Sequence, residues 1–451
     1  MNKIGICILH PWYISSWFDT EIIKEIAVDN EVEILAPSEI IELCKKKALD
    51  NYSIKYVEIK VPPAKFISKA YFFVAMVFKR KKNSSFKIRL KYLLFGELKL
   101  LPSKFDFKDI FAGFNSNFRH FLKYCRHYFY QLPAYIPFID LIMFNSLKIL
   151  YKKSSANLPE QFREKYDLII FIGGNIEIEI FEMIKELNKI GTTSALCIEN
   201  WDNLTSKRFI ITVPNYIFVM GQDSADLASS IQGIDKNRII VAGLPRFNPY
   251  RTKNETENTE YQDEFVVLYL GCYQPHNEVR LINDITDGLS NSNMAGKYRL
   301  IYKPHPGARN RHKDDSELRG PVDIISSSSR ANPTIDTEHT SIIKRANIII
   351  STPTSMLIEC MLLGKKTILD LTNDGVHRST AGLAFNNYIH FKILNEINNL
   401  EKCFDVDQLI ENILLEFSAP TIGRITYNLT DLIENNRVSY SYHILEILKK
   451  L

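Results

Sequence analysis

The chain has 451 residues and a net charge of +4, with 45% hydrophobic and 24% charged residues. This length exceeds one comfortable hydrophobic core and predicts two domains, and the composition excludes a disordered or fibrous protein. The longest apolar run, Ala70 to Phe78, is far shorter than the ~20 residues that span a bilayer. Seven cysteines without CxxC pairs or metal-ligand spacing predict reduced thiols in a cytoplasmic protein.

The first half of the chain alternates predicted strands and helices. Lys3–Leu9 is apolar enough for a strand buried on both faces, and Asp19–Val28 is an amphipathic helix. Glu31–Leu35 is the next strand, so the chain opens as a βαβ unit of a parallel sheet. Further strands of this half are predicted at 56–61, 166–174, 193–198, 215–220 and 238–242.

An aromatic and basic insertion, residues 62–153, interrupts this alternation. From Phe78 to Lys153 the sequence has 16 Lys and Arg against four Asp and Glu. Its apolar residues recur at helical spacing, so we expect a helical subdomain within the N-terminal domain. The local charge fits an anionic lipid surface or an anionic acceptor. The alternative is a folded subdomain with core aromatics and solvated lysines.

A second α/β series follows a polar linker. Residues 249–264 lack periodicity and separate an N-terminal domain, 1–248, from a C-terminal domain, 265–451. Strands of the second domain are predicted at 265–270, 299–302, 322–325, 348–350 and 367–369, with helices over 405–451. Two Rossmann-like α/β domains facing a cleft are the layout of the GT-B architecture. Ligands of such sheets bind at the carboxyl ends of the strands.

A KPHP turn directly follows the predicted strand 299–302. Its two prolines stiffen the backbone and remove two donors, which leaves Lys303 and His305 as the polar groups. A cation and an imidazole at the carboxyl end of a strand can engage a diphosphate or a nucleoside monophosphate. The alternative is a rigid turn whose histidine is satisfied within the fold.

A hydroxyl-rich helix start follows the predicted strand 348–350. Thr354 and Ser355 stand where a helix begins, and exposed backbone N–H groups at such a start bind anions. Glu359, about one turn into the helix, can accept hydrogen bonds from ribose hydroxyls. A capping box accounts for the hydroxyls without any ligand.

Together, the KPHP turn, the helix start and the sequence LLGKK at 362–366 resemble the donor half of bacterial capsule and surface-polysaccharide GT-B transferases. The relatives are capsular Kdo transferases, polysialyltransferases and CDP-glycerol or CDP-ribitol polyol-phosphate transferases. The resemblance covers residues 265–370 and implies that Glu359 faces the ribose. It also implies that four side chains face the nucleotide phosphate: Lys303, His305, Thr354 and Ser355. The same helix start occurs in UDP-sugar GT-B enzymes and in UDP-GlcNAc 2-epimerase, so the base stays open.

The segment 199–207, ENWDNLTSK, follows the predicted strand 193–198 and resembles a segment of bacterial surface-carbohydrate transferases. Sugar transfer with inversion needs a general base, for which Asp202 is favoured over Glu199. The expected acceptor contacts are Trp201, Asn203 and Lys207. An ordinary loop in which Asp202 caps the next turn is the alternative.

Smaller polar loops follow three other predicted strands. Backbone amides and side chains there can meet a phosphate or the acceptor, and each histidine can equally be structural. These candidates are Gly271, Gln274 and His276 for the donor, Gly174 and Asn175 for the acceptor, and His10 as an alternative base.

The sequence therefore predicts an inverting, metal-independent glycosyltransferase of bacterial surface-polysaccharide synthesis without a bound cofactor. A CMP-, CDP- or UDP-activated sugar is expected on the C-terminal domain, and a lipid-linked or oligosaccharide acceptor on the N-terminal domain. Helix dipoles and basic side chains can hold the leaving nucleotide. Alternatives are a polyol-phosphate transferase, a non-hydrolysing epimerase, a nucleic-acid-binding protein and a non-catalytic scaffold. Nucleic acid is disfavoured, because the basic stretch lacks RNP-like and zinc patterns.

Overall fold

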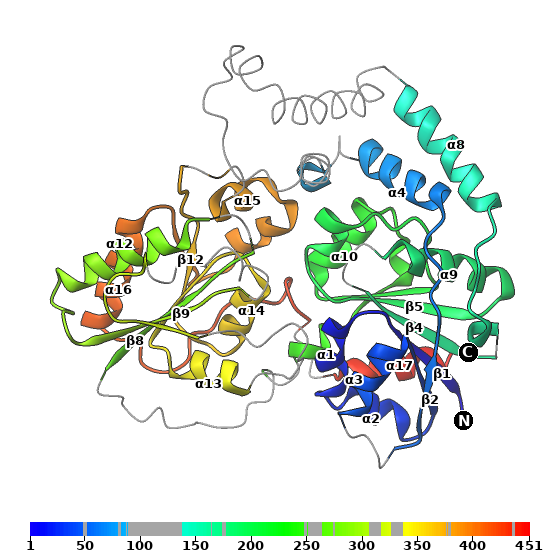
Figure 1. Ribbon diagram of the computed structural model, residues 1–451, viewed down its shortest axis with the longest axis horizontal. Coiled ribbons are helices and arrows are strands. Elements are labelled where there is room, and N and C mark those ends of the chain that lie inside the picture. Colours follow the sequence, from blue (N-terminus) through cyan, green and yellow to red (C-terminus); the bar gives the residue numbers. More distant parts are fainter. Residues whose placement is uncertain are drawn as a thin grey trace.

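A computed structural model describes most of the chain, and it divides into two α/β halves (Figure 1). The described residues are 1–47, 52–79, 83–86, 88, 138–163, 165–173, 177–247, 250, 264–273, 276–305, 317–325, 337–375, 377, 380–434 and 438–451. The predicted linker, 249–264, and the middle of the predicted insertion therefore lie almost wholly outside the described residues.

The N-terminal half is built on a seven-stranded sheet in the order β3-β2-β1-β4-β5-β6-β7, and every pairing is parallel. Its central strand, the fourth in this order, is buried along its whole length because helices cover both faces of the sheet. The strands are β1 (Lys3–Ile8), β2 (Glu31–Ala36), β3 (Ile54–Glu58), β4 (Leu168–Gly173), β5 (Thr193–Ile198), β6 (Tyr216–Val219) and β7 (Ile239–Val241).

Helices connect these strands and form two apolar layers, one on each face of the sheet. The helix after β4 illustrates the local cause: its apolar residues recur at helical spacing, and Gly191 ends it with φ +79°. The helices and helical turns of this half are η1 (Pro11–Tyr13), α1 (Ile14–Phe18), α2 (Ile22–Ala27), α3 (Ser38–Lys45), η2 (Glu160–Arg163), α9 (Ile178–Ile190), the π-helical η3 (Asn203–Lys207), α10 (Gln222–Ser230), η4 (Lys236–Arg238) and η5 (Pro245–Phe247).

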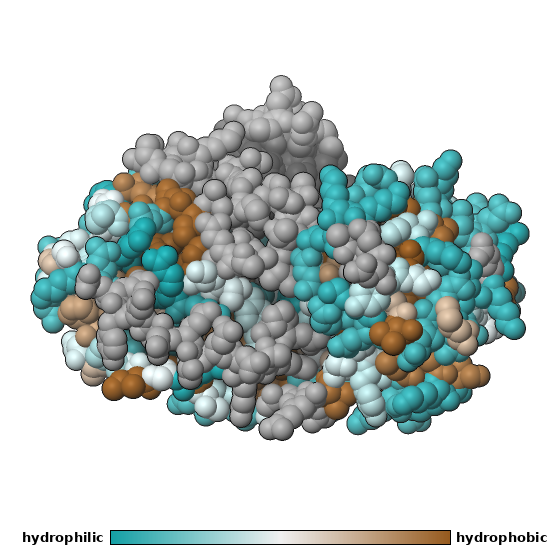
Figure 2. Space-filling view, turned by 90° about the horizontal axis from the view of Figure 1, so that it is seen from below, coloured by the Kyte–Doolittle hydropathy of each residue, from teal (hydrophilic) through white to brown (hydrophobic). Residues whose placement is uncertain are grey.

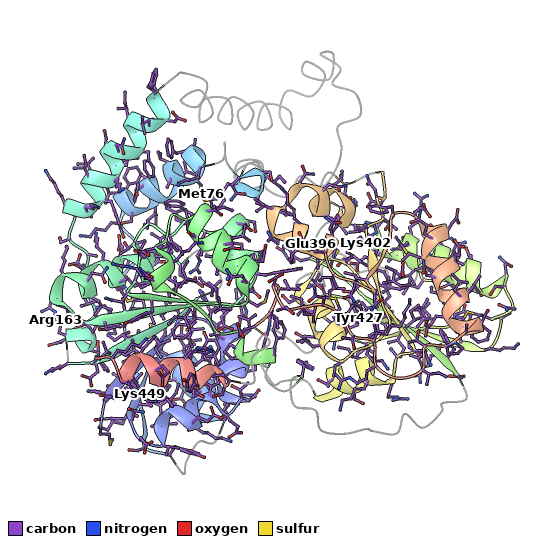
Figure 3. The ribbon with its side chains drawn as sticks, turned by 180° about the vertical axis from the view of Figure 1, so that it is seen from behind. Met76, Arg163, Glu396, Lys402, Tyr427 and Lys449 are labelled. Carbon is purple, nitrogen blue, oxygen red and sulfur yellow. The ribbon has the colours of Figure 1, made fainter. Side chains whose placement is uncertain are left out.

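Two helices of the insertion, α4 (Phe66–Lys79) and α8 (Ile139–Lys153), pack against each other and against the layer that contains α9. Ring pairs join them, with centroids 5.3 Å apart for Tyr71 and Tyr151 and 4.7 Å apart for Phe78 and Phe144. The helical character predicted for this region is confirmed in these two segments. Figure 3 labels Met76, which α4 buries in the N-terminal half.

The C-terminal half contains a six-stranded parallel sheet in the order β10-β9-β8-β11-β12-β13. The predicted strands are all present, and one short edge strand was not predicted from the sequence. The strands are β8 (Phe265–Leu270), β9 (Tyr298–Lys303), β10 (Val322–Ile324), β11 (Ile348–Ser351), β12 (Thr367–Asp370) and the unpredicted β13 (Glu401–Cys403). The helices are α12 (Glu278–Ser290), α13 (Thr337–Arg345), α14 (Ser355–Leu362), α15 (Ala381–Asn387), η8 (Ile389–Asn395) and α16 (Val406–Ser418).

The last helix requires a correction to the predicted domain division. α17 (Tyr440–Leu448) belongs to the apolar layer of the N-terminal half and packs on α2, although residues 265–451 were predicted as one domain. Figure 3 shows Tyr427 within the C-terminal half and Lys449 at the N-terminal half, so the chain returns between them. The helical pattern of 405–451 could not reveal this, because an amphipathic helix does not specify which half covers its apolar face.

The two halves share a buried contact region on the sides that face each other (Figure 1). Met220 and Phe247 of the first half join Leu357 and Met361 of α14 in one apolar cluster. The short segment 83–86 of the insertion also touches the second half, where Ser84 donates to the carbonyl of Asn387 over 2.7 Å. The two parallel sheets with their flanking helices confirm the predicted fold class of two Rossmann-like domains.

The surface seen in Figure 2 is mainly hydrophilic over the described residues, with separate hydrophobic groups on both halves. Among the described residues, no helix is both long enough and apolar enough to cross a bilayer.

Candidate functional site

The predicted polar loops follow neighbouring strands in both sheets. In the first half, β1, β4 and β5 are adjacent, so the segments after Ile8, Gly173 and Ile198 lie along one edge. In the second half, the segments after β9, β8, β11 and β12 are adjacent in the same way. Parallel strands place their carboxyl ends together, and this edge is where open α/β sheets bind ligands.

A histidine and a buried carboxylate meet at the edge of the first sheet. His10 follows β1, and its Nε2 lies 3.5 Å from Oε1 of Glu177, which directly precedes α9. Tyr13 donates its hydroxyl to the same oxygen over 3.3 Å, and Arg208 forms a buried ion pair with the other oxygen. Glu177 is thus fixed from three sides, while the imidazole of His10 remains partly open to solvent.

Glu199 lies in the same cluster but is closed off from solvent. Trp17 donates its indole N–H to Oε1 over 2.9 Å, and Ser16 donates to Oε2 over 3.3 Å. Burial raises the pKa of the Glu199 carboxyl, and the hydrogen bonds and the charge of Arg246 oppose that rise. The carboxylate therefore anchors α1, and a reacting hydroxyl would have to displace one of these donors to reach it.

Two of the tryptophans near this edge, Trp201 and Trp12, have opposite surroundings. Trp201, the predicted acceptor platform, is 6% exposed, and its ring lies 5.3 Å from Phe391 and 5.8 Å from His390 of the other half. These contacts make it a packing residue between the halves. Trp12 is 43% exposed and stacks on His10 at 5.4 Å with an interplanar angle of 17°. Trp12 is thus the indole that borders the histidine–carboxylate pair.

Asp202, the favoured base from sequence, is ion-paired. Its Oδ2 lies 3.0 Å from Nζ of Lys207, and its backbone carbonyl accepts from the hydroxyls of Thr205 and Ser206. Asn203 is fully buried, and neither atom of its amide has a hydrogen-bond partner among the described residues. These residues form the start and body of the π-helical turn η3, a rare conformation that is frequent at functional sites.

The KPHP turn borders the edge of the second sheet. Lys303 is the last residue of β9 and is nearly buried, and its carbonyl accepts from Gly271 N–H over 2.9 Å. The ring of His305 lies edge-on to that of Tyr273 at 5.6 Å. Gly271 leaves room for Glu278 and for the KPHP turn, because a Cβ there would stand 2.7 Å from Oε2 of Glu278 and 3.1 Å from Cα of Pro304.

The predicted helix start after β11 is present. α14 begins at Ser355, with Thr354 as an N-cap whose side chain makes no capping hydrogen bond. The capping-box alternative is therefore not formed in this structure. Glu359 accepts a hydrogen bond from the hydroxyl of Tyr250 over 3.2 Å. Thr354, Ser355 and Glu359 are all partly exposed.

Two histidines converge on Asp374 in the segment after β12. His377 Nδ1 lies 2.6 Å from Oδ2 of Asp374, and His276 Nδ1 lies 3.8 Å from the same oxygen. Thr372 holds the other ring nitrogen of His276 at 3.3 Å. His276 therefore lies at the predicted edge. Among the described residues, no group of three or more His, Cys, Asp or Glu is arranged to hold a metal ion.

Three predicted contacts, Gly174, Asn175 and Gln274, lie outside the described residues. The structure adds seven residues that the sequence did not single out: Trp12, Tyr13, Glu177, Arg208, Tyr250, Asp374 and His377. Glu177 could have been found from the sequence, because it is an acid at a helix start directly after a predicted buried strand. Arg208 had none, since its partner is 31 positions away.

The chain matches no protein-family model, and no curated protein sequence is significantly similar to it. Its fold resembles solved UDP-GlcNAc 2-epimerases. The enzyme from Methanocaldococcus jannaschii gives a TM-score of 0.52 at 12% identity over 100% of both chains. The enzyme from Neisseria meningitidis, with bound UDP-GlcNAc, gives 0.51 at 12% identity over 100% of both chains. At such identities the likeness establishes the fold, in agreement with the predicted GT-B architecture.

Proposed function

We propose that this protein is a nucleotide-sugar glycosyltransferase with its donor on the C-terminal half and its acceptor on the N-terminal half. The observation that carries the proposal is the pair of polar edges at the carboxyl ends of two parallel sheets. One edge offers an open histidine backed by a buried carboxylate, and the other offers a cation and a free helix start. The proposed acceptor is a lipid-linked or oligosaccharide precursor of a surface polysaccharide.

The donor side uses groups suited to a phosphate. The partly exposed N-terminus of α14 carries partial positive charge, and Lys303 and His305 lie two strands away in the same sheet. Partners for the ribose are Glu359 and Tyr250, which already share a hydrogen bond. These groups stabilise the negative charge that develops on the leaving phosphate.

The acceptor side supplies the base, for which the geometry favours His10 over Asp202. When Nε2 of His10 carries the proton and faces Glu177, the lone pair of the imidazole lies on Nδ1. The imidazole takes the proton of the acceptor hydroxyl, and the oxygen attacks the anomeric carbon. The bond from that carbon to the phosphate oxygen breaks, and the nucleotide leaves with the electron pair. Glu177 stabilises the resulting imidazolium, as a buried carboxylate does behind a catalytic histidine.

Point variants test this assignment, with nucleotide release in the presence of a glycan acceptor pool as the readout. His10→Gln should lower kcat by about 10²–10⁴-fold with donor affinity unchanged, because only the proton acceptor is lost. Glu177→Gln should lower kcat in the same direction. Asp202→Asn is the matched control and should retain activity. If Asp202→Asn is inactive and His10→Gln is active, the general base is Asp202 and not His10.

An epimerase is the second candidate. It is favoured by two carboxylates, Glu177 and Glu199, in one cluster and by the likeness over the whole chain to enzymes named UDP-GlcNAc 2-epimerases. Proton NMR of UDP-GlcNAc incubated with the protein alone separates the two functions. Epimerisation without any acceptor would support this candidate, whereas acceptor-dependent nucleotide release supports transfer.

The proposal also concerns which nucleotide carries the sugar. The KPHP resemblance favours CMP or CDP, while the N. meningitidis neighbour holds a uridine nucleotide sugar. Thermal-shift titration with CMP, CDP, UDP and GDP distinguishes them, because a ligand that binds only the folded state raises the unfolding temperature. A shift with UDP alone would remove the CMP and CDP preference.

A further inference from the structure

The outer face of α8 is apolar although nothing in the described structure covers it. The inner face is formed by residues at helical spacing, namely Asp140, Phe144, Leu147 and Tyr151, which turn towards α4 and the protein. Ile142 and Ile149 are seven residues apart and therefore lie on one face of the helix, opposite those residues. Their side chains are 61% and 54% exposed. Three further apolar residues of α8 are also exposed: Leu141, Met143 and Leu150.

The charged side chains exposed on α8 have one sign. Lys148, Lys152 and Lys153 are exposed on the same helix. The only acid in α4 and α8 is Asp140, which is buried. Phe66, the first residue of α4, is 85% exposed. The adjacent Lys65 donates to the carbonyl of Ser155 just beyond the end of α8, so Phe66 lies near the lysine-rich end of that helix.

The helix is fixed to the body of the N-terminal half. The hydroxyl of Tyr151 donates to the carbonyl of Phe181 in α9 over 3.2 Å and lies 2.5 Å from the hydroxyl of Thr212. Since α9 begins directly after Glu177, the exposed face is rigidly connected to the half that carries the proposed acceptor site.

We propose that the outer face of α8, together with Phe66, docks the protein on an anionic lipid bilayer surface. A helix with exposed Ile, Leu and Met beside lysines, and too short to span a bilayer, matches interfacial helices that lie in the plane of the headgroups. Lysines beside the buried apolar side chains attract anionic headgroups. A protein partner fits less well, because lysine is depleted in protein–protein interfaces. The docking rests on α8 and Phe66, and the proposed function gives it a purpose, since a lipid-linked acceptor is held at such a surface.

The test is co-sedimentation of the full chain with vesicles of phosphatidylcholine, with or without phosphatidylglycerol. The wild type should bind the anionic vesicles, with affinity that falls as salt rises. The double variant Ile142→Ser/Ile149→Ser should bind about tenfold more weakly or worse, because two apolar side chains leave the bilayer. Lys148→Gln/Lys152→Gln/Lys153→Gln should lose the preference for anionic vesicles over neutral ones.

The matched control removes two exposed isoleucines elsewhere, Ile190→Ser/Ile422→Ser, and should bind vesicles like the wild type. All these side chains are exposed, so the unfolding midpoints should agree and a folding defect is recognisable. Equal binding by the Ile142→Ser/Ile149→Ser variant and the wild type would overturn the proposal. So would a wild-type dimer that this variant dissociates in light scattering, because the occupant would then be a second copy. Nucleotide binding is measured separately by thermal shift. Failure of the proposed function can therefore be distinguished from failure of the membrane docking.

Discussion

Arg208 shows how a single residue supports the candidate site. Its side chain is fully buried, pairs with Glu177 and lies 5.7 Å from the ring of Phe181. The guanidinium also explains the last residue of β4, because a Cβ on Gly173 would stand 2.9 Å from Arg208 Nη1. The buried carboxylate behind His10 is therefore packed against a buried cation.

We expect Arg208→Ala to lower the free energy of unfolding by about 3–5 kcal/mol, because Glu177 would remain buried without its cation. Chemical denaturation measures this loss. Arg280→Ala is the control, since that arginine forms an exposed pair with Asp284 and should change stability by about 1 kcal/mol or less. A loss at Arg208 no larger than at Arg280 would mean that Glu177 is solvated in the folded protein.

At the scale of elements, close backbone packing holds α15 in place. A Cβ on Gly382 would stand 2.1 Å from the carbonyl oxygen of Leu371, in the segment after β12. Since α15 is followed by η8, which carries His390 and Phe391, this contact also sets the position of the segment that meets the first half.

Gly382→Ala should therefore destabilise the protein by about 1–3 kcal/mol, as overpacking against a backbone does. Gly288→Ala offers a matched comparison within α12. Its added Cβ would meet the terminal methyl of Ile410 at 2.4 Å, and that flexible side chain can move. Alanine also gains about 1 kcal/mol of helix propensity over glycine, so this variant should be close to neutral. Denaturation midpoints of the two variants measure this difference. Equal losses of stability in Gly382→Ala and Gly288→Ala would show that α15 can shift to accommodate the added Cβ.

For the whole molecule, the contact between the halves contains a buried histidine. His390 is hydrogen-bonded to Thr205 at 2.6 Å and packs on Trp201. Burial lowers the pKa of His390 to about 4, with the charge of Asp202 raising it and that of Lys207 lowering it further. The neutral imidazole is therefore the form that fits the contact.

This pKa makes stability depend on pH. The unfolded chain binds a proton at His390 near pH 6.5 and the folded chain only near pH 4, so stability falls as pH drops between these values. The full loss is about 3 kcal/mol. Unfolding free energies measured from pH 7 to 4.5 should fall less steeply in His390→Gln than in the wild type. Parallel pH profiles would contradict a neutral, buried His390.

Both sheets, nearly all of their strands and the loops that carry Lys303, His305, Thr354 and Ser355 could be predicted from the sequence. These features follow from local patterns: continuous apolar runs, stiff proline turns and hydroxyls at a helix start. The choice between His10, Glu199 and Asp202 could not be made locally. The proposed preference for His10 rests on the contacts of His10 with Glu177, of Glu199 with Trp17 and of Asp202 with Lys207.

Where each amphipathic surface is covered could be read only from the three-dimensional arrangement of the chain. It placed Trp201 between the halves and left Trp12 open beside His10, although the two indoles look alike as residues after a strand. It also returned α17 to the N-terminal half and left the outer face of α8 exposed. The reason is physical: periodicity shows that a helix has an apolar face, whereas burial depends on contacts between segments hundreds of positions apart.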